Sequence, residues 1–209
     1  MNTYYLDKGC ALSTRDRIVD AAADVLRRQG LAHATTKQIA AAAGLSEAAL
    51  YKHFPGKEAL LVAVVHEHLP ELVGTLKQLP ELVGRHTVAD NLTHVAGVAV
   101  PFYRELVPMA GALFAEPTLL ARHQEGLREQ GLGPHLAIAA LAGYLAAEQR
   151  GGRIAATADP RAAAAALLGA CVQRAFFTEF VGPHSVAEDE AAFATAIVGQ
   201  VMRALAPEG

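Results

Sequence analysis

Residues 44–60 (GLSEAALYKHFPGKEAL) gather the side chains of this chain that are best suited to chemistry. A tyrosine hydroxyl, two lysine ammonium groups and a histidine ring stand close together at Tyr51, Lys52, Lys57 and His53. Hydroxyl and N–H donors of this kind suit phosphate oxygens. The chain has no GxSxG, glycine-rich phosphate loop or CxxC, so the stretch indicates binding of phosphate rather than catalysis.

A helix over Ser46–Phe54 would divide these residues between two faces. Leu50 and Phe54 are four residues apart and share one face, whereas Ala48 and Lys52 point to the opposite side. We therefore expect Leu45, Leu50 and Phe54 to be buried and the polar side chains to remain outside. The outer residues are Glu47, Ala48, Tyr51, Lys52 and His53.

A second short helix precedes this one and ends at a tight turn. It begins at Thr35 or Thr36, carries Ile39 and Ala40 on its inner side, and ends at Gly44, which can take a positive φ at little cost. Two short helices joined by a glycine turn describe a helix-turn-helix. The major groove of B-DNA admits one α-helix, so the outer face of the second helix would reach base edges there.

Helix patterns fill the rest of the chain, and strand patterns are nearly absent. Ser13 with Asp16 forms a capping box before an apolar stripe, and Gly30 ends that first helix. The predicted fold is all-α, with about nine to ten helices. After a fourth helix from Lys57, further helices are expected at 88–106, 108–115, 117–130, 134–150, 160–181 and 187–205, with breaks at Pro101 and Pro108 among others.

The charge balance alone does not indicate a nucleic-acid partner, because the basic excess at the front of the chain is small. The chain has 18 basic and 21 acidic residues, but residues 1–60 hold 8 basic against 6 acidic ones. The sequence LPELVG occurs at 69–74 and again at 79–84, which we interpret as a local duplication without function. The predicted domains are a tail over 1–12, a DNA-binding domain over 13–60 and a body over 61–209.

The remaining side chains favour neither metal binding nor secretion. Cys10 and Cys171 are interpreted as inert thiols of a reducing cytoplasm, and the histidines lack partners at ligand spacing. The N-terminus has no signal peptide pattern. The longest uncharged apolar runs are shorter than the roughly 18 residues that span a membrane. We expect a cytoplasmic protein without metal or cofactor that is not an enzyme.

The first 60 residues resemble the DNA-binding domain of TetR-type transcriptional regulators. The resemblance runs through TRDRIVDAAADVLRRQG, ATTKQIAAAAGLS and ALYKHFPGKEAL. It implies a three-helix DNA-binding head, a connecting fourth helix, and a divergent helical body that dimerises and usually holds a small effector. On this resemblance the DNA-binding positions are Thr35, Thr36, Lys37, Ser46, Glu47, Ala48, Tyr51, Lys52, His53 and Lys57.

Within that set the resemblance assigns two roles. Tyr51, His53, Lys57 and Thr36 match phosphate-contact positions, whereas Glu47, Ala48 and Lys52 match base-reading ones. Glu47 departs from the neutral or basic residue of many members. Its carboxylate would accept a hydrogen bond from a cytosine amine, or it would repel phosphate and merely cap its helix.

The body offers candidates for an effector site and a dimer contact. An apolar cavity with a few polar groups is the usual form of a small-molecule site, although apolar stripes also form plain core. The candidates for effector contact are Val98, Phe102, Leu106, Met109, Leu113, Leu127, Leu141, Tyr144, Cys171 and Arg174. The resemblance implies a homodimer through the last two helices, and Phe176 beside Phe177 favours an outer as well as an inner partner.

The sequence thus predicts a dimeric regulator that binds double-stranded DNA at a palindromic operator, most simply a repressor released by a small-molecule effector. One alternative is an architectural or division-control protein of the same fold that binds DNA without an effector. Another is a helical binding module or enzyme unrelated to DNA.

Overall fold

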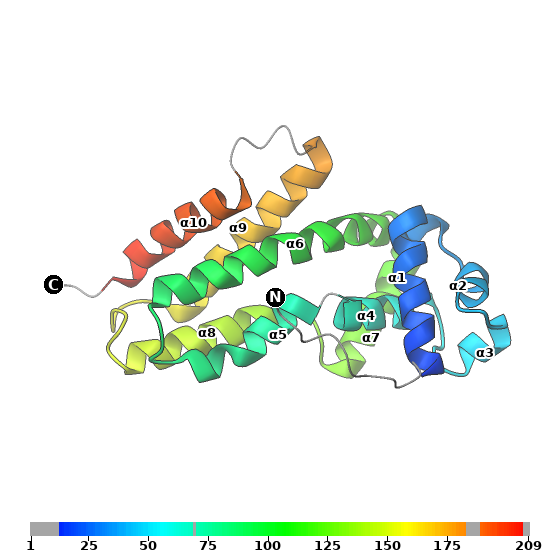
Figure 1. The fold of residues 1–209 in the computed structure, drawn as a ribbon, viewed down its shortest axis with the longest axis horizontal. Helices are drawn as coiled ribbons and strands as arrows, with labels where there is room; N and C mark the ends of the chain where they lie inside the picture. The colour runs from blue at the N-terminus through cyan, green and yellow to red at the C-terminus, as the bar shows by residue number, and fades with distance from the viewer. Residues whose placement is uncertain (1–12, 69, 183–188, 207–209) are drawn as a thin grey trace, which may run out of the picture. The chain divides into compact units, whose positions relative to one another are not determined.

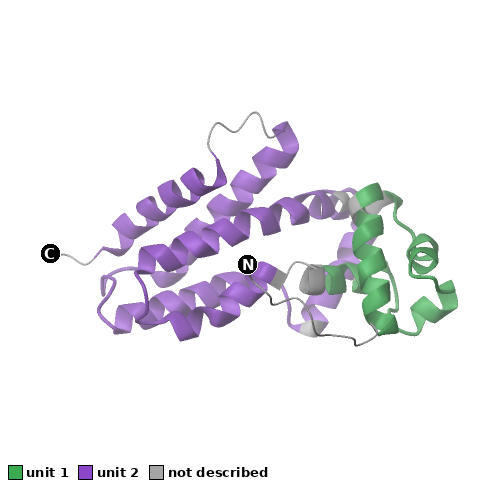
Figure 2. Cartoon of the chain, in the orientation of Figure 1, with its two compact units in different colours: residues 1–68 green, residues 69–209 purple. Residues whose placement is uncertain are grey.

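The computed structural model describes residues 13–68, 70–182 and 189–206. Every regular element within these ranges is a helix, which confirms the all-α prediction (Figure 1). The chain divides into two compact units, residues 1–68 and 69–209 (Figure 2). The predicted tail over residues 1–12, with Cys10, lies outside the described residues.

The first unit is built on helix α1 (Thr14–His33), which contacts both α2 (Thr36–Ala42) and α4 (Lys57–His68). The predicted capping box is present, because the Ser13 side chain accepts from the Asp16 N–H and Asp16 accepts from the Ser13 N–H. The regular helix is interrupted at Gly30, where φ is 73°. The apolar stripe of α1 is buried at Ile18, Ala21, Ala22, Val25 and Leu26.

Helix α4 packs against α1 within this first unit. The boundary expected between residues 60 and 61 therefore falls inside α4. Leu60, Leu61 and Val64 of α4 are buried. Helix α4 thus contributes buried apolar residues to the core of the first unit, in addition to those of the predicted three-helix head.

Helix α3 is shorter than predicted. It spans Glu47–Tyr51 rather than Ser46–Phe54, and Lys52 and His53 continue as a turn. The reason is Pro55, since the residue before a proline is disfavoured in the helical region. The turn still brings Phe54 back onto the inner face, because the Phe54 N–H donates to the Leu50 carbonyl at 3.0 Å.

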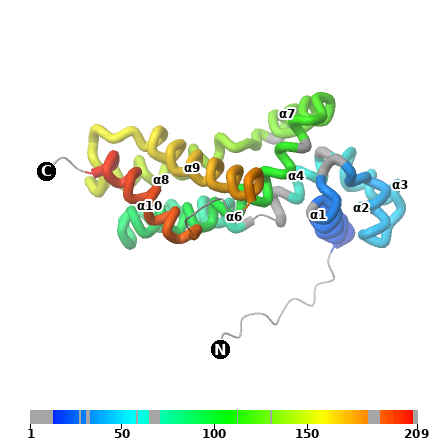
Figure 3. Tube along the Cα trace, turned by 90° about the horizontal axis from the view of Figure 1, so that it is seen from above, coloured from blue at the N-terminus to red at the C-terminus, as the bar shows by residue number. Residues whose placement is uncertain are grey.

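The described residues of the second unit form seven helical elements. These are α5 (Pro70–Gln78), the 3-10 helix η1 (Leu79–Leu82), α6 (Val88–Ala115), α7 (Pro117–Gln130), α8 (His135–Arg150), α9 (Pro160–Val181) and α10 (Glu190–Leu205). All of them except α7 supply side chains to one core. Helices α6, α9 and α10 lie side by side in both views, and α8 packs on α9 (Figures 1 and 3). The predicted start of the last helix at residue 187 lies outside the described residues.

Helix α6 corrects the sequence prediction. The prediction broke the segment at Pro101 and Pro108, but a single helix runs through both. Each proline removes one backbone N–H and strains the helix. Packing outweighs that cost, because Leu92, Val95 and Ala99 of this helix are all fully buried against its neighbours.

The two copies of LPELVG fold differently. Pro70 begins α5, an α-helix with acidic Glu71 in its first turn. The second copy forms the 3-10 turn η1 instead, and its last residue, Gly84, has a φ of 76°. The same sequence therefore begins an α-helix in one place and forms part of the connection between α5 and α6 in the other, so its surroundings decide its structure.

Two helices of the second unit are long and apolar. Helices α6 and α9 are each long and apolar enough to cross a membrane by length and composition, although the uncharged runs considered in the sequence are shorter. Core helices of soluble proteins pass the same test. Here both helices supply buried residues to the same core, including Ala99 and Leu167, so the observation is weak.

Candidate nucleic-acid interface

Helices α2 and α3 pack on each other, and α2 packs on α1. The apolar residues that they bury lie on their inner sides. Ile39, Ala40, Leu50 and Phe54 are buried, as predicted, while Leu45 is only half-buried. Since the inner face is occupied by core contacts, the outer face of α3 is the one left for a partner.

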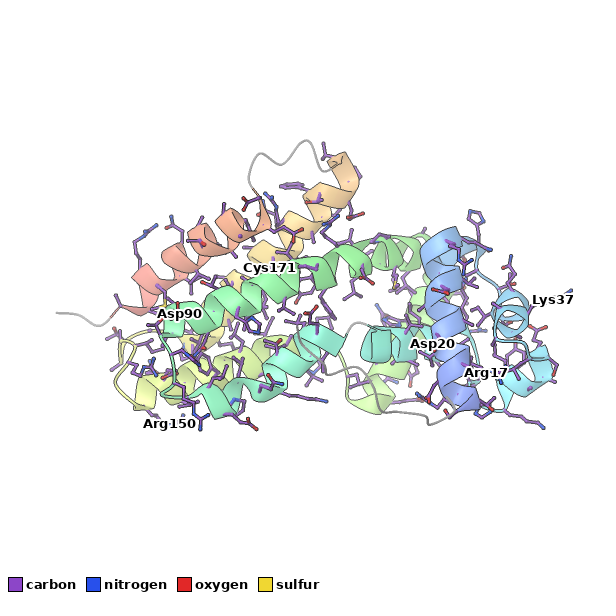
Figure 4. The ribbon with its side chains drawn as sticks, in the orientation of Figure 1. Arg17, Asp20, Lys37, Asp90, Arg150 and Cys171 are labelled. Carbon is purple, nitrogen blue, oxygen red and sulfur yellow. The ribbon has the colours of Figure 1, made fainter. Side chains whose placement is uncertain are left out.

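The turn between α2 and α3 is held from α1 by Arg17. Its Nη2 donates to the carbonyl oxygen of Ala43 at 2.6 Å, at the C-terminal end of α2 (Figure 4). Gly44 follows with a φ of 68°, as the sequence predicted. Sequence reasoning missed Arg17, because nothing in the local pattern shows that a side chain 26 positions earlier caps this turn.

Replacing Gly44 with alanine should destabilise the first unit. A Cβ at this position would lie 3.3 Å from Arg17 Nη2, and φ is positive. The left-handed conformation costs a residue with a Cβ roughly 1–2 kcal/mol, so urea unfolding should show a loss of about that size. Gly143→Ala is the matched control. It lies in α8 with open space around it, and a fall in stability as large as that of Gly44→Ala would contradict the explanation.

The outer face presents a compact set of polar side chains. Ala48, Lys52 and His53 are exposed, as is Tyr51 at 48%. Lys37 points away from the unit on α2 (Figure 4). Lys57, at the first position of α4, is half-buried. An exposed alanine amid donors allows a backbone to approach a groove closely, as a DNA-reading helix requires.

Three side chains on this face form a hydrogen-bonded chain. The Thr36 hydroxyl donates to Glu47 Oε1 at 2.6 Å, and the hydroxyl oxygens of Thr36 and Tyr51 are 3.2 Å apart. The single proton of Thr36 is directed to the carboxylate, so Tyr51 must be the donor to Thr36. The Thr36 proton therefore points to Glu47, and the Tyr51 proton points to the Thr36 oxygen.

The helix caps come from neighbouring residues. Thr35 caps α2 in a reciprocal box with Gln38, and the Ser46 side chain accepts from the Ala49 N–H to cap α3. The interpretation of Glu47 as the cap of its own helix is therefore wrong, because Ser46 occupies that role. Glu47 instead joins α3 to the start of α2.

Comparison with known proteins agrees with this geometry. Residues 18–64 match the family model of bacterial regulatory proteins, tetR family. The match covers most of the N-terminal unit, which is therefore similar to a TetR-type DNA-binding domain. The chain is also similar to the transcriptional regulator SrpR of Pseudomonas putida, to which it is 49% identical over 55 residues. That alignment covers 26% of this chain and 26% of SrpR, so the similarity concerns about a quarter of either chain.

Solved structures show that the fold extends through the body. A chain from Mesorhizobium loti assigned to the TetR family superposes with a TM-score of 0.72 at 22% identity, over 91% of this chain and 95% of that one. FadR of Bacillus subtilis, solved in complex with stearoyl-CoA, gives 0.64 at 18% identity, over 90% and 98%. The matching relatives are named as transcriptional regulators, in agreement with the prediction that the chain is not an enzyme.

The ten effector candidates fall into separate groups in the body. Val98, Leu141, Tyr144 and Cys171 lie within the packed core, and burial raises the pKa of the Cys171 thiol to about 12 (Figure 4). Arg174 of α9 is directed at α10, where its guanidinium lies 5.4 Å from the centre of the Phe193 ring.

The other five candidates are related by position on α6 and α7. Phe102, Leu106, Met109 and Leu113 recur every three or four residues and so share one stripe of α6. Phe102, Leu106 and Met109 are half-buried and Leu113 is buried, while Leu127 is half-buried on α7, the helix that packs on α6. The stripe is thus the part of the candidate set that lies along one side of a single helix.

A buried polar network in the body was not predicted. Glu148 of α8 is 1% exposed and accepts from the Gly84 N–H at 3.2 Å, and Arg153 Nη1 lies 3.4 Å from its Oε2. Beside it the Tyr144 hydroxyl accepts from Asn91 Nδ2 at 2.8 Å. Burial, together with the Glu148 carboxylate, raises the pKa of Tyr144 to about 12. Within the described ranges, no three His, Cys, Asp or Glu side chains are placed to hold a metal.

Proposed function

We propose that the protein is a cytoplasmic transcriptional regulator that binds a palindromic DNA operator as a homodimer and is released by a small-molecule effector. The observation that carries the proposal is the TetR-type unit whose α3 buries Leu50 inward and exposes Ala48, Tyr51 and Lys52. A helix with one committed face and one polar face can enter the major groove of B-DNA.

Selection of duplexes from a randomised pool, at two salt concentrations, tests the proposal directly. We expect a palindrome with fixed half-site spacing and affinity that falls steeply with salt, since phosphate contacts release counterions. Enrichment of no sequence at low or high salt would contradict it. Enrichment of many unrelated sequences would favour the architectural alternative.

Homodimer formation is supported by an apolar face on α9. Val172, Phe176, Phe177, Phe180 and Val181 are all at least 40% exposed, and Phe180 is 77% exposed. Phe176 and Phe180 stack with ring centres 5.2 Å apart. Exposed apolar groups of this size mark protein–protein contacts, and a two-fold contact would provide the symmetry that a palindrome requires.

Release by an effector is supported by the half-buried stripe on α6. Phe102, Leu106 and Met109 present apolar surface that is neither fully covered nor fully exposed. FadR of Bacillus subtilis shares the fold and was solved with an acyl-CoA, so this fold can hold such a molecule. An effector that binds the DNA-released state more tightly would shift the population toward it. Unchanged operator affinity with every ligand shown to bind the body would contradict this step.

Different substitutions on the α3 face should have different effects. Tyr51→Ala is expected to weaken binding to all duplexes by about tenfold or more, since a hydrogen bond to a charged group contributes about 1.5–3 kcal/mol. Lys52→Ala should instead change the ranking of sites. Fluorescence anisotropy with a panel of single-base variants measures both. An equal loss on every duplex for both proteins would contradict this division of roles.

A further inference from the structure

We infer that Glu47 determines specificity by competing with DNA phosphate for the hydroxyl proton of Thr36, to which Tyr51 in turn donates. This inference rests on the proposed function. Its basis is the chain in which Tyr51 donates to Thr36 and Thr36 donates to the Glu47 carboxylate, with oxygen separations of 3.2 Å and 2.6 Å.

The hydrogen-bonded series from Tyr51 through Thr36 to Glu47 contains only two hydroxyl protons, and each already takes part in a hydrogen bond. A threonine or tyrosine hydroxyl has one proton to donate, and an ionised carboxylate only accepts. A phosphate oxygen also only accepts, so Thr36 and Tyr51 can bind it as donors only with the same two protons. The Glu47 carboxylate thus takes the place of a phosphate on the free protein.

Contact with the DNA backbone therefore has a fixed cost at this position. Either Thr36 keeps its bond to Glu47 and makes no donor contact with phosphate, or Glu47 releases it and must find another donor. A released carboxylate close to bare phosphates is unfavourable, because two negative charges then approach each other. This cost applies on any sequence, and nonspecific binding depends almost entirely on phosphate contacts.

A specific DNA site can offer the released Glu47 carboxylate a new hydrogen bond, whereas nonspecific DNA cannot. Glu47 begins α3, the helix whose outer residues face the groove, and amino groups on base edges are the donors available to a carboxylate there. Where such an amino group is in reach, the released carboxylate regains a hydrogen bond. The same residue then penalises random sequence and tolerates a chosen one, which is specificity by exclusion.

The test compares full-length wild type with Glu47→Gln on the selected duplex and on a random-sequence duplex. Glutamine keeps the shape and an acceptor oxygen but removes the charge. We expect affinity for the random duplex to rise by about threefold to tenfold, in the range of single surface charges, and affinity for the selected duplex to rise less or to fall. The ratio between the two duplexes should drop. Thermal unfolding establishes that both proteins are folded.

Two further variants separate this mechanism from a general charge effect. Asp24→Asn removes one exposed carboxylate of the same unit that pairs with Arg28 rather than with Thr36, and it should leave the ratio unchanged. In a Thr36→Val background the effect of Glu47→Gln should fall to less than half, because the shared hydroxyl is gone.

The outcomes distinguish the inference from the function on which it rests. If wild type binds DNA but Glu47→Gln binds random DNA no more tightly than wild type does, the inference alone is overturned. An effect that persists in full without the Thr36 hydroxyl, or that Asp24→Asn reproduces, would do the same. Absence of binding by wild type to every duplex at low salt would overturn both.

Discussion

Replacing Phe176 and Phe180 together with glutamate should convert the proposed homodimer into monomers. The two rings stack on each other on the exposed side of α9, and Phe180 is 77% exposed. Buried aromatic residues at the centre of an interface typically contribute about 2 kcal/mol or more each. Two of them, replaced by charges that would face each other across a two-fold axis, should weaken association by at least about a hundredfold, since about 1.4 kcal/mol is tenfold.

Analytical ultracentrifugation over a concentration series measures this change, and operator affinity should fall in parallel because each monomer reads only one half-site. Phe114→Glu is the matched control, since Phe114 is a similarly exposed phenylalanine, at 72%, on α6 instead of α9. Association that remains at the wild-type level in the double variant would contradict the assignment of the dimer contact to this face of α9.

Replacing Glu148 with alanine should lower the free energy of unfolding by about 3 kcal/mol, because breaking a buried ion pair leaves the other charge without compensation. Glu148 accepts from the Gly84 N–H and pairs with Arg153, which also donates to the carbonyl of His86. The carboxylate therefore holds the connection after η1 against α8. Removing it leaves the Gly84 N–H and the Arg153 guanidinium without this acceptor.

Urea denaturation followed by circular dichroism gives the number. Glu129→Ala, at an exposed position on α7, should change stability by no more than about 0.5 kcal/mol. The double variant with Arg153→Ala should lose less than the sum of the two single variants. A loss below about 1 kcal/mol for Glu148→Ala would mean that water replaces the carboxylate without difficulty.

The parts of this protein that sequence could predict are those fixed by local chemistry. The Ser13 box, the positive φ of Gly44 and the burial of Leu50 follow from capping, backbone freedom and helical period. The compact α2–α3 unit was predictable for the same reason. Its outer face could be named because its inner face was so clearly apolar.

The parts that sequence missed depend on residues far apart in the chain. The cap of α2 by Arg17 joins residues 26 positions apart, and the bond from Gly84 to Glu148 joins residues 64 positions apart. One sign of the second was available. Glu148 follows Leu141 and Tyr144 at helical spacing, so a carboxylate on the apolar side of α8 already indicated a buried partner.

Helix α6 was predicted wrongly because proline rules are local and its continuity is not. Its buried core residues hold the helix up to Val100, and partly buried Phe102 and Tyr103 pack on the same core directly after Pro101. The hydrogen bond of the Glu47 side chain could not be predicted from the sequence either, because its partner Thr36 lies on another helix.

The two prolines also determine where α6 is mechanically weakest. Pro101 cannot bond the carbonyl of Gly97, and Pro108 cannot bond that of Arg104, so two rungs are missing from the backbone ladder. Phe102 and Leu106 lie between these gaps, and Met109 lies just beyond the second. Bending at such points costs less than bending an intact helix. The half-buried stripe therefore lies on the part of α6 that bends most easily. A small molecule inserted beside this part would tilt one end of the helix more than one inserted elsewhere along it.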